Sequence, residues 1–208
     1  LVTRGPGATN ASIGVHTAFQ DSTPMILFVG QVASDQRDRE AFQEIDYRRM
    51  FGPLTKWVAQ IDSAERIPEF VSRAFYAAMS GRPGPVLLAL PEDMLAERAV
   101  VANAPPVRVP LIGPEGAAVG ELMSRLAGAE RPVFIVGGGG WTEEARRDME
   151  AFAANTNVPV AASFRCQDYF DNLHPCYAGH VGIGINPLLA SQLREADLVV
   201  SLGARLGE

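Results

Sequence analysis

The first candidate for chemistry is a glycine-rich segment at residues 5–10, with the sequence GPGATN. Glycine adopts backbone conformations closed to other residues and lets a ligand approach the main chain closely. Unpaired N–H groups at the start of a following helix favour an anion or a polar ring. Asn10 stands where the third glycine of the dinucleotide fingerprint would be, so that pattern is not met. A tight turn between a strand and a helix explains the same residues equally well.

A second glycine run, residues 137–140, follows an apolar stretch at residues 132–136. It falls at the carboxyl end of an expected strand, where open α/β sheets bind their ligands. Thr142 and Glu143 occupy the two positions at which a third fingerprint glycine could stand. Four successive glycines lose much conformational entropy on folding, which favours a nucleotide-like ligand over a plain loop. A third run, residues 179–184, is explained more simply as a flexible surface loop.

No catalytic constellation accompanies these turns. The sequence has no GxSxG, HExxH or Walker motif, and its aspartates lack metal-ligand spacing, so we expect no metal ligands in the chain. A net charge of −6, with Lys56 as the one lysine, argues against nucleic acid as a partner. The apolar runs fall far short of the ~20 residues that span a membrane. Cys166 and Cys176 indicate inert thiols in a reducing cytoplasm rather than a disulfide framework.

Short apolar runs alternate with segments of helical period. The strand-like runs lie at residues 25–29, 86–90, 133–136, 158–162 and 198–202. Helical spacing of apolar residues predicts helices around residues 11–18, 67–78, 119–126, 145–152 and 188–193. We expect the third of these helices to start at Pro114, the fourth to be capped by Thr142 and the fifth by Asn186. The alternation predicts an α/β fold of two doubly wound, mostly parallel-sheet units.

A proline-dense segment at residues 99–114 contains four prolines and has no helical period. Such segments form semi-rigid linkers. We therefore expect one domain at residues 1–98 and another at residues 115–208. The sequence begins and ends close to apolar runs, so we also expect it to be a piece of a longer polypeptide.

Several short strings stand in the order and spacing of a known enzyme family. They are GPGATN at 5–10, AFQDSTP at 18–24, GQV at 30–32, AFQE at 41–44, SGRPGPV at 80–86, LPED at 90–93, the glycines at 137–140, EADL at 195–198 and LGAR at 202–205. With these strings the chain resembles the thiamine-diphosphate-dependent enzymes of the acetolactate synthase type. The resemblance implies that residues 1–98 are the C-terminal part of a pyrimidine-binding domain. It also implies that residues 115–208 are a truncated, Rossmann-like central domain.

The resemblance implies an enzyme that decarboxylates a 2-oxo acid, either as a simple decarboxylase or as a carboligase that joins the resulting unit to a second carbonyl. In this family the glutamate that activates the cofactor precedes the GPGATN segment, and here it would lie upstream of Leu1. The diphosphate and Mg²⁺ are held by a third domain, beyond residue 208. On this basis we expect no catalytic residue within the chain itself and no activity from it alone.

The resemblance also assigns roles to individual residues. Pro6 and Asn10 would lie against the aminopyrimidine of a neighbouring subunit's thiamine diphosphate, which implies a homodimer or homotetramer with shared sites. Gln43 would hydrogen-bond the activating glutamate or the cofactor, and Phe42 would wall the substrate channel; without the resemblance, Gln43 is a solvated side chain and Phe42 a core residue. In acetolactate synthases the central domain binds FAD. The matching positions here are Arg82, Gly137, Gly138, Ser163, Phe164, Arg165, Gly182, Ile183 and Arg205.

Two other functions remain open. One is a non-catalytic module that binds FAD, ADP or NAD, or an oxidoreductase domain, and this hypothesis rests on the glycines at 137–140 alone. The other is a degenerate homologue with a scaffolding role, which only the residues upstream of Leu1 can exclude.

Overall fold

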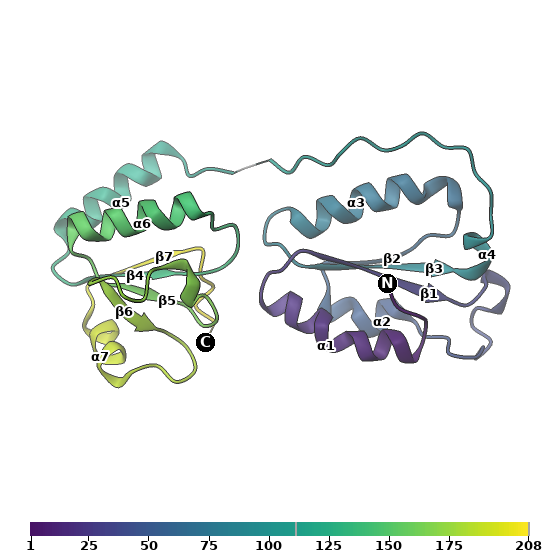
Figure 1. The fold of residues 1–208 in the computed structure, drawn as a ribbon, viewed down its shortest axis with the longest axis horizontal. Coiled ribbons are helices and arrows are strands. Elements are labelled where there is room, and N and C mark those ends of the chain that lie inside the picture. The colour runs from purple at the N-terminus through teal and green to yellow at the C-terminus, as the bar shows by residue number, and fades with distance from the viewer. Residues whose placement is uncertain (111, 208) are drawn as a thin grey trace. The chain divides into compact units, whose positions relative to one another are not determined.

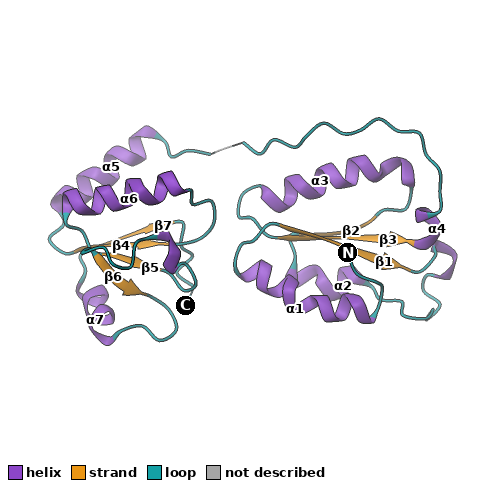
Figure 2. Cartoon of the chain, viewed as in Figure 1, coloured by secondary structure: helices purple, strands orange, loops and turns teal. Residues whose placement is uncertain are grey.

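The computed structural model describes residues 1–110 and 112–207. These residues divide into two compact units, Leu1–Leu111 (the first unit) and Ile112–Glu208 (the second unit). Leu111, which falls in the expected linker, and Glu208, the last residue of the expected second domain, lie outside the described residues. Residues 99–110 and 112–115 belong to no helix or strand, and Figure 2 draws this stretch as loop.

The first unit is a parallel sheet with helices on both faces. Its strands β1 (Met25–Gln31), β2 (Trp57–Gln60) and β3 (Pro85–Pro91) are arranged in the order β1-β3-β2. Helices α1 (Pro6–Gln20) and α2 (Tyr47–Phe51) cover one face, and α3 (Ile67–Met79) covers the other (Figure 1). The short helix α4 (Glu92–Leu95) follows β3 directly.

The central strand β3 shows why this sequence forms a two-sided sheet. Leu87 and Ala89 face the core under α1 and α2, while Val86 and Leu88 face the core under α3. Successive side chains of a strand point to opposite faces, so a strand buried on both sides must be almost entirely apolar. All four of these residues are buried, which confirms the strand predicted at residues 86–90.

The second unit is also a parallel sheet. Its strands β4 (Pro132–Val136), β5 (Val160–Ala162), β6 (Tyr177–His180) and β7 (Leu198–Leu202) lie in the order β6-β5-β4-β7. Helices α5 (Gly116–Gly128) and α6 (Glu143–Thr156) cover one face, and α7 (Pro187–Glu195) lies on the other (Figure 1). The predicted α/β class and the doubly wound arrangement are therefore confirmed.

Two of the three predicted helix starts are confirmed and one is wrong. Thr142 accepts a hydrogen bond from the Ala145 amide at 3.1 Å, and Asn186 accepts one from the Leu188 amide at 2.8 Å. Helix α5, however, begins at Gly116 rather than at Pro114. Glu115 has an extended backbone, with ψ 141°, so the helix cannot include Pro114.

Two strands were not predicted, and one of them corrects the reading of residues 179–184 as a loop. Gly179 and His180 belong to β6, where they pair with Ala161 and Ala162 of β5. Strand β2 was missed as well. Both strands are four residues long and lie at sheet edges, where half-buried residues leave no continuous apolar run. Among the described residues, no helix is both long and apolar enough to cross a membrane.

Candidate functional site

The turn before α1 is strained in a way that only glycine tolerates. Gly5 caps the helix with φ 57° and ψ −110°, and Pro6 is the first helical residue. Residues 6–10 of the GPGATN segment are therefore helical, and the turn itself is confined to residues 3–5 (the Gly5 turn). Val2 pairs with Val29, which brings the Gly5 turn to the carboxyl end of β1. This is the edge at which open α/β sheets bind ligands.

Gln43 lies against this turn, although it is almost forty residues away in the sequence. A Cβ atom placed on Gly5 would stand 2.7 Å from the Cβ of Gln43 and 3.0 Å from its carbonyl oxygen. Gln43 itself has a left-handed backbone, with φ 66°. The structure thus brings together the predicted residues Pro6 and Gln43, with Gly5 as the point of close approach.

The other two predicted residues of this region face outward. Asn10 is exposed, one helical turn after Pro6, and Phe42 is 77% exposed beside Gln43. An apolar ring left this open is not a core residue, so the core interpretation of Phe42 is wrong. Pro6, Asn10 and Phe42 are thus all exposed to solvent.

Tyr47 of α2 holds the Gly5 turn against β1, and the sequence reasoning missed it. Its hydroxyl donates to the Gly30 carbonyl oxygen at 3.0 Å and accepts from the Gly5 amide at 3.3 Å. Burial raises the pKa of Tyr47 above its ordinary value of 10, against the opposing effects of the Gly5 amide and the Arg4 charge. The hydroxyl therefore remains a donor at neutral pH. No sequence signal distinguishes this tyrosine from other core aromatics.

Replacing Tyr47 with phenylalanine removes both hydrogen bonds and keeps the ring. Because the Gly5 amide is left buried without a partner, we expect the free energy of unfolding of the first unit to fall by about 1–2 kcal/mol. Urea denaturation in a Trp141→Phe background, followed by Trp57 fluorescence, measures this loss. The matched control is Tyr76→Phe on α3, where the tyrosine is about half exposed. Equal losses in the two variants would contradict the role assigned to Tyr47.

Arg4 adds a positive charge next to the same turn. Its Nη1 lies 2.6 Å from a carboxylate oxygen of Glu92, at the end of β3. Its Nε is buried, with no hydrogen-bond partner among the described residues. Glu92 is more than half exposed, so solvent screens the pair and it contributes little to stability. The ion pair holds the Arg4 guanidinium in place beside Gly5.

The glycines at 137–140 (the Gly137 turn) follow β4, as predicted. Gly137 and Gly138 allow close packing of neighbouring segments. A Cβ on Gly137 would lie 2.1 Å from the Ser163 Oγ, and one on Gly138 would lie 2.1 Å from the Gly203 carbonyl oxygen. The ends of β4, β5 and β7 therefore approach one another more closely than any side chain allows. Gly140, in contrast, has φ 85° and no atom within 4 Å of an added Cβ.

Two aromatic residues that the sequence reasoning did not identify cover the Gly137 turn. The Trp141 Nε1 donates to the Gly137 carbonyl oxygen at 2.9 Å, and the Tyr169 hydroxyl donates to that of Gly138 at 2.8 Å. The two rings stack with centroids 5.5 Å apart. Burial raises the pKa of Tyr169, which keeps this donor protonated at neutral pH. Both carbonyls are thus already paired, so a ligand would meet the outer residues of the turn.

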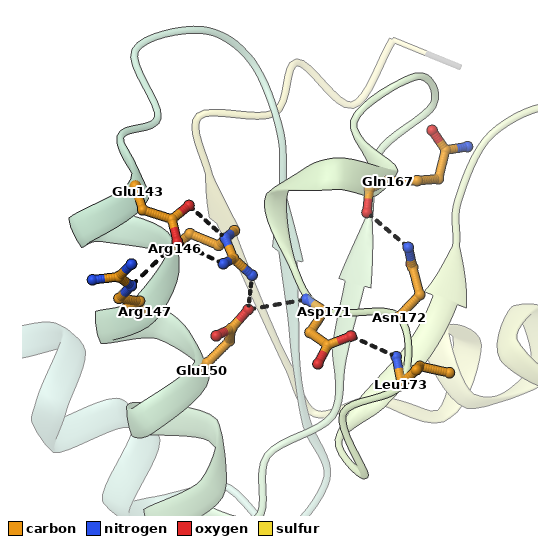
Figure 3. Close-up of polar contacts among 8 residues, drawn as sticks. All are labelled: Glu143, Arg146, Arg147, Glu150, Gln167, Asp171, Asn172 and Leu173. Atoms are coloured by element: carbon orange, nitrogen blue, oxygen red, sulfur yellow. Dashed lines mark hydrogen bonds and ion pairs between the residues drawn. The ribbon is translucent and has the colours of Figure 1, made fainter.

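An ion-pair network fastens the loop that carries Tyr169 to α6. Figure 3 shows Arg146 between the carboxylates of Glu143 and Glu150, at 2.8 and 2.5 Å. A Glu150 oxygen also accepts from the Asp171 amide at 3.1 Å, and Asp171 accepts in turn from the Leu173 amide (Figure 3). The hydrogen bond to the Glu143 carboxylate raises the pKa of Arg146 above its ordinary value.

The remaining predicted residues of the second unit gather at the carboxyl edge of the same sheet. Ser163, Phe164 and Arg165 follow β5, and the Arg165 guanidinium lies 5.2 Å from the Phe164 ring centroid. Gly182 and Ile183 come shortly after β6, and Arg205 comes after β7. The structure thus places these residues at the same edge of the sheet as the Gly137 turn.

Arg82, the other residue of the expected nucleotide set, belongs to the first unit. It lies just before the amino end of β3, opposite to the edge that carries the Gly5 turn. Its guanidinium donates to the Ser22 hydroxyl at 2.9 Å and to the Phe19 carbonyl oxygen at 2.7 Å. These contacts tie the end of α1 to the start of β3.

One pocket lies beside the site in the first unit, and another lies away from the Gly137 turn in the second unit. A pocket of about 550 Å³ opens at the carboxyl ends of the strands and is lined by Gln31, Tyr47 and Gln60 among others. The larger pocket of the second unit, about 770 Å³, lies at the amino ends of β4 and β5, near Pro132 and Pro159. It is therefore remote from the Gly137 turn. Among the described residues, no cluster of His, Cys, Asp or Glu could hold a metal ion.

Two parallel α/β units, each with a glycine turn at the carboxyl edge of its sheet, make this an α/β protein of the doubly wound class. Residues 1–50 match the family model described as "Thiamine pyrophosphate enzyme, N-terminal TPP binding domain", and residues 119–208 match "Thiamine pyrophosphate enzyme, central domain". The chain belongs to the thiamine pyrophosphate enzyme family. These comparisons do not favour a separate nucleotide-binding module.

Relatives with assigned names agree with this family. The chain is 32% identical over its whole length to the acetolactate synthase large subunit of Haemophilus influenzae, covering 37% of that protein. It is 35% identical over 99% of its length to a probable acetolactate synthase large subunit of Methanocaldococcus jannaschii, covering 36%. The subunit from Lactococcus lactis is 33% identical, with 37% covered. The chain thus spans little more than a third of the length of these relatives.

Proposed function

We propose that the chain is part of a thiamine-diphosphate-dependent enzyme that decarboxylates a 2-oxo acid and ligates the resulting unit to a second carbonyl. One observation carries the proposal: the Gly5 turn, Gln43 and Tyr47 form a rigid edge beside the exposed side chains of Pro6, Asn10 and Phe42. Residues 1–98 would act as the pyrimidine-binding part, residues 99–114 as a linker and residues 115–208 as the central domain.

Each residue of this edge has a distinct task in the proposal. The ring of Pro6 and the amide of Asn10 would contact the aminopyrimidine of thiamine diphosphate, and Gln43 would supply a hydrogen bond to it or to the activating carboxylate. Phe42 would exclude water from the substrate channel. Bound thiamine diphosphate supplies a carbanion and an electron sink for the decarboxylation. The proposal includes Mg²⁺ for the diphosphate, bound outside these residues, and a homodimer or homotetramer that shares the sites.

For the second unit we propose a bound FAD at the edge formed by Gly138, Phe164, Gly182 and Ile183. The residues fit a nucleotide in one respect: the guanidinium groups of Arg165 and Arg205 are exposed at that edge and pair well with phosphate. Gly137 and Ser163 would shape the edge from within, since Gly137 is buried against Ser163. The two free cysteines suit a cytoplasmic location.

The test uses the complete polypeptide that the gene encodes, purified with and without thiamine diphosphate and Mg²⁺. We expect release of CO₂ from at least one member of a panel of pyruvate, 2-oxobutyrate and benzoylformate, and loss of that activity after the cofactors are removed by chelator and dialysis. Saturating binding of thiamine diphosphate without consumption of any panel member would contradict the proposal. Binding of FAD, ADP or NAD in the same preparation, without consumption of any panel member, would favour the nucleotide-module alternative.

A further inference from the structure

The loop that carries Phe42 and Gln43 holds an unusual backbone conformation. Asp38, Glu40 and Gln43 all have positive φ values, between 55° and 66°. Residues other than glycine avoid this region, and each one held there raises the free energy of the folded state by of order 1 kcal/mol or more. Three of them within six residues require specific interactions that hold the loop in place.

One side chain supplies those interactions from inside the loop. The two carboxylate oxygens of Glu44 accept the amide of Asp38 at 2.7 Å and the amide of Ala41 at 3.2 Å. The amide of Glu44 in turn donates to the Ala41 carbonyl oxygen at 2.9 Å. Hydrogen bonds to an ionised acceptor are roughly twice as strong as neutral ones, so Glu44 closes the loop on itself.

The end of the loop is fixed to the sheet by a second side chain. Gln31, buried at the end of β1, donates through Nε2 to the Ile45 carbonyl oxygen at 2.9 Å. Its Oε1 accepts from the Val32 amide at 2.9 Å. The segment from residue 38 to residue 45 therefore has one internal brace, Glu44, and one anchor on β1.

We propose that Glu44 is a positioning residue, which holds Phe42 outward and Gln43 against the Gly5 turn. The inference rests on the proposed function, because the two residues it positions are those expected to meet cofactor and substrate. Glu44 itself is not expected to contact cofactor or substrate, because both of its carboxylate oxygens accept hydrogen bonds from backbone amides of its own loop. Its effect on turnover must therefore pass through Gln43 and Phe42.

Glu44→Gln tests the brace with almost no change of shape. An amide offers one oxygen acceptor, and its NH₂ group would face the second backbone amide donor-to-donor. Glu40→Gln is the matched control: it lies on the same loop, loses the same charge, and its carboxylate has no hydrogen-bond partner among the described residues.

The first measurement is limited trypsinolysis of the chain at native conditions, with the cut after Arg39 quantified by mass spectrometry. Arg39 is exposed in the braced loop, so its cleavage reports local opening. We expect Glu44→Gln to speed this cut about tenfold; Glu40→Gln is instead compared by kcat/KM, which it should leave within twofold, because residue 40 forms part of the cleaved bond. An unchanged rate in Glu44→Gln would overturn the proposal.

The second measurement is a double-mutant cycle in the complete encoded polypeptide, with thiamine diphosphate and pyruvate or the best 2-oxo acid of the panel. We expect Glu44→Gln to lower kcat/KM about tenfold alone and by less than twofold in a Gln43→Ala background, because the two act through one contact. A purely structural role would give the same loss in both backgrounds and would overturn the proposal. If the wild type turned over no 2-oxo acid, the proposed function would fail, while the trypsin result would still decide whether Glu44 braces the loop.

Discussion

Gly5→Ala is expected to lower the free energy of unfolding of the first unit by about 3 kcal/mol, the sum of backbone strain and overpacking. The φ of 57° with ψ of −110° lies outside the regions that an alanine adopts readily. The added Cβ would also stand 2.7 Å from the Gln43 Cβ, and the nearby Gln43 backbone cannot move without disturbing its own loop. The chain has two tryptophans, Trp57 in the first unit and Trp141 in the second. Urea denaturation of a Trp141→Phe background, read by Trp57 fluorescence, isolates the first unit.

Gly14→Ala, in the same helix, is the control for this prediction. No atom lies within 4 Å of an added Cβ at Gly14, which is exposed in the middle of α1. Alanine favours a helix by up to about 1 kcal/mol over glycine, so stability should rise slightly. A Gly5→Ala protein as stable as its parent would show that the Gly5 turn is not constrained as described. In the complete enzyme the same substitution should also weaken thiamine diphosphate binding, because it displaces Gln43.

Gly138→Ala is the second large effect, and it falls on the second unit. The new Cβ would lie 2.1 Å from the Gly203 carbonyl oxygen, at a φ of 77°. Gly203 follows β7 and pairs with Val136, so its carbonyl can withdraw only by breaking that pairing. We expect a loss of about 4 kcal/mol or more in the free energy of unfolding of this unit, with Trp141 fluorescence as the readout in a Trp57→Phe background.

Gly140→Ala separates steric packing from backbone strain in the same turn. Gly140 also has a positive φ, 85°, but an added Cβ meets nothing within 4 Å. Only the conformational cost remains, about 1–2 kcal/mol. If Gly138→Ala and Gly140→Ala lowered the free energy of unfolding equally, the close approach of Gly203 would not be the reason that residue 138 must be glycine. A ligand that required every glycine of the turn would instead show itself as loss of binding in both variants.

Much of the fold could be predicted from the sequence, because the signals are local. A strand buried on both faces needs a nearly continuous apolar run, and β3 and β4 have one. Helix starts carry their own capping side chains, as Thr142 and Asn186 do. The edge strands β2 and β6 lack such runs, because part of each strand is solvated and its length is short. Their assignment needs the neighbouring strand.

Glycine patterns alone indicated the segments 5–10 and 137–140, but roles for individual residues came from the family resemblance. Pro6, Asn10 and Gln43 were expected in one place, and the structure brings Gln43 to the turn before Pro6. Of the residues that hold this edge together, Tyr47 lies in no motif, and Glu44 belongs to the AFQE string but had no role assigned to it. Each acts by hydrogen bonds to backbone groups, and a backbone amide looks the same at every position of a sequence.

The order of residues alone determined the alternation of strands and helices, the helix caps and the positions where glycine is needed, since each depends on neighbours along the chain. Tertiary structure alone decided what those glycines serve. Without a Cβ, Gly5 can pack against Gln43, which is 38 residues away in the sequence. In the same way Gly138 can pack against Gly203, which is 65 residues away. Close approach between distant segments is a property of packing in three dimensions, and no local pattern encodes which two backbones will meet.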